Sequence, residues 1–100
     1  MKEIEVGGIK KEVILEIIAL AKKYGLTKVI LFGSRARGDY HRASDIDLAV
    51  QNGNITGFSL EVEENTSTLL TFDVIDMNRE YQREFMESIQ QEGKVLYEKI

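Results

Sequence analysis

Apolar residues recur every three or four positions in the first quarter of the chain. The members of this pattern are Ile9, Val13, Ile17, Leu20, Ala21 and Tyr24. Such spacing places side chains on one side of a helix, so it predicts an amphipathic helix over residues 9–24. Lys22 and Lys23 fall in the last predicted turn and Gly25 follows, which is a common way for a helix to end.

Two short apolar runs then predict strands. Residues 28–32, Lys-Val-Ile-Leu-Phe, are apolar and β-branched and end at Gly33, as expected of a buried strand. Residues 45–50 alternate acidic and apolar side chains before the turn sequence Asn-Gly-Asn at 52–54. Because successive side chains of a strand point to opposite faces, this strand should direct its acids to one face and its apolar residues to the core.

Residues 55–68 fit two kinds of structure. Phe58, Leu60 and Val62 alternate as in a strand, whereas Phe58 and Val62 also lie four positions apart, as on one side of a helix. The segment stays open between strand and helix. After it, residues 69–75 read Leu-Leu-Thr-Phe-Asp-Val-Ile and predict a third strand.

The last quarter of the chain predicts a helix and a short apolar strand. Residues 77–91 carry a large apolar residue at every fourth position, and Gly93 follows. Residues 95–97, Val-Leu-Tyr, form the final apolar run. The order of elements predicts an α/β (α+β) fold, a small mixed β-sheet with helices packed on one face, and we expect residues 1–100 to form a single domain.

Composition narrows the chemistry and the setting. The chain of 100 residues is 43% hydrophobic and 30% charged, which is typical of a globular domain. It has no cysteine, and His41 is its only histidine, so a bound metal would be a hard cation held by carboxylates. The charged start and the lack of a long apolar stretch favour a cytoplasmic protein without a membrane partner. The net charge of −4 argues against long nucleic acid as a partner.

Two aspartates supply the candidate metal ligands. Asp45 and Asp47 lie two positions apart on a predicted strand, so both carboxylates should point to the same face. Two neighbouring anions on a stiff element are poorly stabilised unless a cation lies between them. Carboxylate oxygens select Mg²⁺ or Mn²⁺ among the common divalent ions.

A candidate phosphate site lies just upstream. Gly33 and Ser34 follow the first predicted strand, where glycine allows backbone N–H groups to approach a phosphate and a short helix start adds a favourable dipole. The Ser34 hydroxyl and the guanidinium of Arg35 or Arg37 offer further donors. Simpler roles are a helix cap for Ser34 and solvated or partner-contacting charges for the two arginines.

The spacing of these residues identifies a family resemblance. Gly33-Ser34, ten intervening residues and then Asp45-x-Asp47 resemble the signature of the DNA polymerase beta-like nucleotidyltransferase superfamily. The chain is most similar to the minimal nucleotidyltransferase (MNT) domains of the MntA-like antitoxin type, in Leu-Phe-Gly-Ser-Arg-Ala-Arg-Gly and Ser-Asp-Ile-Asp-Leu and in the closing Glu-Gly-Lys-Val-Leu-Tyr-Glu. The resemblance spans most of the chain, with residues 55–68 the least typical part.

The resemblance implies a catalytic site with two Mg²⁺ ions and a third carboxylate on a later strand. Asp73 is the matching residue, and Asp76 is its competitor, because aspartate at a strand end commonly caps the next turn. Asp45 and Asp47 would bridge both ions, and Asp73 would hold the ion that activates the acceptor hydroxyl. These three acids are therefore the expected catalytic residues and metal ligands.

The resemblance also implies the substrate and the partner. Gly33 and Ser34 would bind the β- and γ-phosphates of an NTP, with ATP favoured, and Arg37 would neutralise triphosphate charge. The expected reaction is transfer of AMP to a hydroxyl of a small helical HEPN-type partner in a toxin–antitoxin pair, in a homo- or hetero-oligomer. The alternatives are a catalytically weak nucleotide- and partner-binding module, or nucleotidylation of a small molecule held by a separate subunit.

Overall fold

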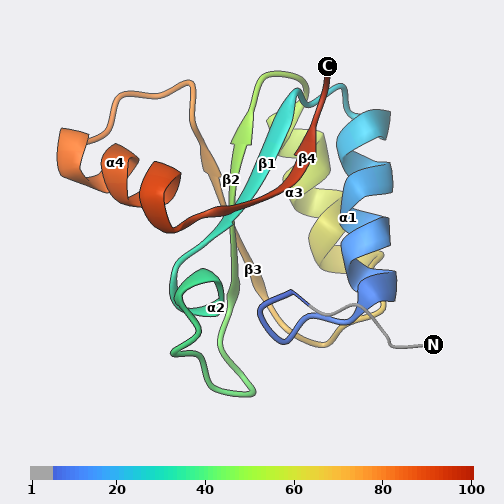
Figure 1. Cartoon of the computed structure of the whole chain (residues 1–100). Helices are drawn as coiled ribbons and strands as arrows, with labels where there is room; N and C mark the ends of the chain where they lie inside the picture. Colours follow the sequence, from blue (N-terminus) through green and yellow to red (C-terminus); the bar gives the residue numbers. More distant parts are fainter. Residues whose placement is uncertain (1–5) are drawn as a thin grey trace.

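A four-stranded mixed sheet forms the centre of the computed structural model, which describes residues 6–100 (Figure 1). The strands are β1 (Lys28–Phe32), β2 (Ile46–Gln51), β3 (Phe72–Asp76) and β4 (Lys94–Glu98). Their order across the sheet is β3-β2-β1-β4. Strand β1 is antiparallel to both of its neighbours, whereas β3 is parallel to β2. The predicted small mixed sheet is confirmed.

Four helices surround this sheet on both faces (Figure 1). They are α1 (Lys11–Lys23), α2 (Ser34–Arg37), α3 (Ile55–Glu64) and α4 (Arg83–Glu92). Leu31 and Leu48 pack in the core cluster with α1 and α3, while Ile30 and Ala49 pack with Ile89 of α4. Because neighbouring strand positions face opposite ways, α1 and α3 cover one face and α4 the other. The expectation of helices on one face therefore holds for α1 and α3 but not for α4.

The segment left open at residues 55–68 is a helix in its first part. Phe58 and Val62 of α3 are fully buried, whereas Leu60 between them is 62% exposed, as the helical period requires. The side chain of Asn54 accepts a hydrogen bond from the backbone N–H of Gly57 and caps the first turn. Burial of one side against the sheet therefore decides between the two structures.

Three elements begin two or more residues later than predicted, whereas the bounds of the remaining predicted strands agree to within one residue. The first helix begins at Lys11 because Val6 and Ile9 bond to each other in a tight turn before it. Strand β3 begins at Phe72 rather than at residue 69, since Leu69 is fully exposed. Helix α4 begins six residues later than position 77, because a turn anchored on Asp76 follows β3.

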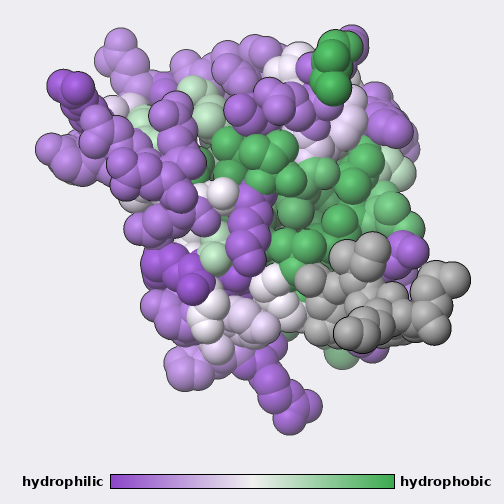
Figure 2. All heavy atoms as spheres, in the orientation of Figure 1, coloured by the Kyte–Doolittle hydropathy of each residue, from purple (hydrophilic) through white to green (hydrophobic). Residues whose placement is uncertain are grey.

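The molecular surface is unevenly divided between polar and apolar residues. Figure 2 shows polar residues around α4 and α2, and a gathering of apolar residues on the side where α1 lies. Within residues 6–100, no helix has the length and apolar character needed to cross a membrane.

Candidate active site

Parallel pairing of β2 with β3 brings the predicted acids together. Asp47 on β2 is the direct register partner of Asp73 on β3. Because paired strands lie about 4.8 Å apart and aligned residues share a face, the two carboxylates project side by side. Asp45 lies one residue before β2, and its carboxylate accepts a hydrogen bond from the hydroxyl of Thr71. The three aspartates therefore lie on the face of the sheet that α4 partly covers.

The electrostatics of this acidic group centre on Asp47. Partial burial raises the pKa of the Asp47 carboxyl above its ordinary value near 3.8, and the negative charges of Asp73 and Asp45 raise this pKa further. The positive charges of Arg37 and Arg35 lower the Asp47 pKa but do not cancel the rise. Within residues 6–100, no three His, Cys, Asp or Glu side chains already surround a single point as metal ligands would. Three carboxylates with mutual repulsion nevertheless match the donor chemistry of a hard divalent cation.

Gly33 connects the acids to the start of α2. Its φ of +75° is strained for any residue with a side chain. A Cβ atom at this position would collide with the carboxylate of Asp47, because Phe32 and Asp47 are antiparallel partners. Glycine is therefore required both by the turn and by the close approach of the acid.

Ser34 is the first residue of α2, and Gly33 occupies the N-cap position. No side chain caps this helix, so the simpler role of Ser34 as an N-cap is wrong. The N–H groups of Ala36 and Arg37 already bond to the Gly33 carbonyl, so an anion at this turn would meet the N–H groups of Ser34 and Arg35. The hydroxyl and backbone of Ser34 thus lie at an anion-compatible turn beside Asp47.

The two arginines of α2 lie in different environments. Arg37 is exposed and forms ion pairs with Asp39 (3.4 Å) and with Glu92 of α4 (3.6 Å). Arg35 is only 2% exposed and donates hydrogen bonds to backbone carbonyls. Arg35 is therefore neither a solvated charge nor a free phosphate donor, and Arg37 alone is accessible to a nucleotide.

Asp76 and Thr71 take roles that clarify the prediction around β3. The Asp76 carboxylate accepts a hydrogen bond from the backbone N–H of Asn78, so this acid anchors the turn after the strand, as its position at the strand end indicated. Thr71 was not predicted as a site residue. It lies two positions before Asp73, in the same strand phase, and this Thr-x-Asp spacing was the available signal.

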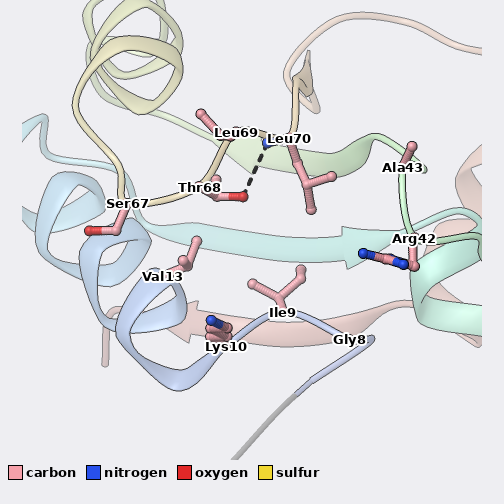
Figure 3. A pocket seen from close by; sticks show the side chains of 10 residues that line it. All are labelled: Gly8, Ile9, Lys10, Val13, Arg42, Ala43, Ser67, Thr68, Leu69 and Leu70. Atoms are coloured by element: carbon pink, nitrogen blue, oxygen red, sulfur yellow. Dashed lines mark hydrogen bonds between the residues drawn. The ribbon is translucent and has the colours of Figure 1, made fainter.

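A cavity of about 560 Å³ lies away from the acids, on the side of the sheet that α1 and α3 cover (Figure 3). Ile9, Val13 and Leu70 form much of its apolar lining, with Lys10 and Arg42 among the remaining side chains. Ile46 and Leu48 point to this side, so Asp47 between them points to the other. The acidic group is therefore an open surface site rather than part of this cavity.

Comparison with known proteins agrees with this geometry. The family described as polymerase beta, nucleotidyltransferase matches residues 15–100. A protein of Methanocaldococcus jannaschii, named a putative protein adenylyltransferase, is 36% identical over 90 residues, which cover 79% of this chain and 88% of the relative. The fold is similar to that of a toxin–antitoxin complex crystallised with AMP-PNP, with 25% identity and a TM-score of 0.66 over 85% of this chain and 73% of that chain. A mutant of the toxin–antitoxin MntA–HpeT gives 23% identity and a TM-score of 0.65 over 85% of this chain and 73% of that chain.

Proposed function

The chain belongs to the polymerase beta nucleotidyltransferase family, and from this premise we propose that it transfers AMP from ATP to a hydroxyl group on a partner protein. The archaeal relative is named for protein adenylylation, and a structural neighbour at 25% identity was crystallised with the ATP analogue AMP-PNP. The observation that carries the proposal is the contact of the Gly33 turn with Asp47, itself aligned with Asp73. The turn that could bind phosphate and the acids that could bind metal therefore lie close enough to contact the same nucleotide.

Asp45, Asp47 and Asp73 are proposed to hold two Mg²⁺ ions. Their carboxylate oxygens fit a hard cation, and such a cation would relieve the repulsion that raises the Asp47 pKa. Bound Mg²⁺ would supply Lewis-acid stabilisation of the attacking and leaving oxygens. Asp73 is more exposed than Asp47, which suits a group that also accepts the proton of the incoming hydroxyl.

The triphosphate is proposed to bind at the start of α2. Gly33 leaves the backbone free to approach a phosphate, and Ser34 would add a hydroxyl donor to the backbone N–H groups of residues 34 and 35. Arg37 is exposed near Asp47 and would neutralise the negative charge that the β- and γ-phosphates bring. Its ion pairs with Asp39 and Glu92 are exposed and therefore weak, so a phosphate could replace them.

The acceptor is proposed to be a small helical protein of the HEPN type, paired with this chain as toxin and antitoxin. The support is the chain's similarity to toxin–antitoxin structures. Residues 1–100 would act as one nucleotidyltransferase domain, with the acceptor surface supplied by the partner in a hetero-oligomer. We place the reaction in the cytoplasm, where ATP is supplied.

The proposal is tested by transfer of label from α-³²P-ATP to the co-purified partner in the presence of Mg²⁺. The wild type should label the partner, and omission of the metal should abolish labelling. An Asp45→Asn/Asp47→Asn variant should bind the partner normally but leave it unlabelled. Equal labelling by wild type and variant would exclude these acids as metal ligands. A wild type that binds the partner without labelling it would show a binding role for this acceptor.

A further inference from the structure

Arg35 is a buried cation without a carboxylate partner. Its side chain is 2% exposed, and among residues 6–100 no ion pair reaches it. Instead, Nε donates to the carbonyl of Ser44 (3.0 Å) and Nη1 to that of Gly7 (2.8 Å). Nη2 donates to the carbonyls of Arg42 (3.1 Å) and His41 (3.5 Å). Burial of a charge is costly unless such bonds compensate it, so this arrangement has one well-defined geometry.

The carbonyls come from two segments, the N-terminal turn at Gly7 and the loop of residues 41–44 that leads to Asp45. Arg35 itself follows Ser34 at the start of α2, while the Ser44 carbonyl belongs to the peptide bond that joins Ser44 to Asp45. Ser44 is held further by its own bonds to His41, through both its backbone N–H and its hydroxyl. One planar guanidinium therefore fixes the distance between the phosphate turn and the first acid.

The N-terminal turn is built against the same arginine. Gly7 and Gly8 have φ values of +57° and +72°, which glycine adopts without strain. A Cβ at Gly7 would lie 2.6 Å from the backbone oxygen of Arg35, and one at Gly8 would lie 2.6 Å from the ring of Tyr40. The Tyr40 ring in turn lies 4.9 Å from the Arg35 guanidinium. The turn, the ring and the guanidinium pack as successive layers.

We infer that Arg35, together with Gly7, Gly8 and Tyr40, forms a clasp that holds Asp45 in register with the phosphate turn. Arg35 is then a positioning residue, and the inference rests on the proposed function. The region that matches the family begins at residue 15, so the N-terminal half of the clasp lies outside it. Displacement of catalytic groups by about 1 Å can lower activity about 100-fold, so a fixed separation matters for the reaction.

The clasp is tested with Arg35→Lys and Gly7→Ala in the full chain. Lysine has no planar fork and cannot reach all of these carbonyls, whereas Gly7→Ala keeps the guanidinium and displaces only the turn. Arg42→Ala is the matched control, because Arg42 contributes its backbone carbonyl alone. Amide hydrogen exchange of residues 39–45 and binding of AMP-PNP with Mn²⁺ are measured on each protein, with circular dichroism to show that it is folded.

Arg35→Lys should speed exchange at residues 39–45 while the amides of α1 and β1 stay protected, and should weaken Mn²⁺-dependent AMP-PNP binding about tenfold. Gly7→Ala should act in the same direction, and it decides the question if Arg35→Lys does not fold. Arg42→Ala should match the wild type. Unchanged exchange and affinity in folded variants would overturn the clasp, as would protection lost equally across α1 and β1. If the wild type itself fails to bind AMP-PNP, the proposed function fails, while the exchange data still decide the clasp.

Discussion

At the residue scale, the acidic group of the proposed site lowers the free energy of unfolding, because its carboxylates repel one another. Asp47 is partly buried beside Asp45 and Asp73, and its raised pKa reflects the cost of that position for the ionised carboxylate. A neutral side chain at position 47 would avoid this repulsion and make the folded protein more stable. The conflict predicts opposite effects of one substitution on stability and on activity.

Asp47→Asn should stabilise the metal-free protein at pH 7 while abolishing transfer. The folded-state pKa of Asp47 lies above its ordinary value near 3.8, so the folded state favours the protonated carboxyl and loses stability as pH rises through that pKa. Asparagine stays neutral, and its Tm should exceed that of the wild type by a few degrees at pH 7. The difference should shrink as pH falls towards 4, and a lower Tm for Asp47→Asn at pH 7 would contradict the predicted repulsion.

Gly33→Ala should separate a collision from simple backbone strain. Gly33 has φ +75° and ψ −154°, a region that essentially only glycine adopts, so alanine there should cost about 1–3 kcal/mol of folding free energy. Its Cβ also displaces the Asp47 carboxylate, so transfer should fall about 100-fold. Gly25→Ala is the control, since its φ is +70° and its Cβ would meet no atom within 4 Å. Urea unfolding should show a loss for Gly33→Ala at least as large as that for Gly25→Ala, while only Gly33→Ala loses transfer activity. Equal activity in the two would argue against a contact between the turn and the acid.

At the scale of single elements, the hydrophobic pattern predicts a helix or strand correctly where only one period fits it. Strand β1 was predicted with its observed bounds, because a continuous apolar run ended by glycine has one interpretation. The sequence did not decide between strand and helix for α3, because Phe58 and Val62 fit both periods and only the exposure of Leu60 distinguishes them. The start of α4 was predicted too early, because residues with a helical apolar pattern lie in the turn that Asp76 anchors.

The candidate site divides in the same way. The spacing in the sequence was enough to propose Gly33, Ser34, Asp45 and Asp47 as site residues, because they lie close together in sequence on two elements. The burial of Arg35 could not be predicted, since it depends on carbonyls from two segments that are distant in sequence, residue 7 and residues 41–44. Backbone carbonyls carry no signature in the sequence, so such a contact requires the folded structure.

Asn54→Ala should weaken α3 without affecting the chemistry. The Asn54 side chain caps the helix through the N–H of Gly57, and loss of such a cap costs about 1 kcal/mol. In a domain of this size, that loss lowers Tm by about 4–8 °C. Asn54→Ser retains a capping oxygen and should restore most of the Tm. Transfer activity per folded molecule should be equal in all three proteins, and a selective loss in Asn54→Ala would link α3 to the site.

At the scale of the whole molecule, one face of the sheet supports the apolar core and the other carries the proposed site. The face under α1 and α3 buries the larger apolar cluster, including the fully buried Ile17, Leu31, Leu48 and Phe58. The other face is covered only in part by α4, through Ile89, Phe85 and neighbours, and leaves the acids accessible. A chain of 100 residues has a modest core, so ligand binding at the open face should make a large contribution to its total stability.

Binding of AMP-PNP with Mg²⁺ should therefore raise Tm strongly. At a free ligand concentration of 100 times Kd, binding adds about 2.7 kcal/mol, which corresponds to about 10–20 °C in a domain of this size. Thermal unfolding with nucleotide alone, Mg²⁺ alone and both together separates the contributions, and the combination should exceed the sum of the two. The Asp45→Asn/Asp47→Asn variant should lose this excess, because nucleotide then binds without its metal. A rise equal to that of the wild type would mean that these carboxylates do not hold the ion on which nucleotide binding depends.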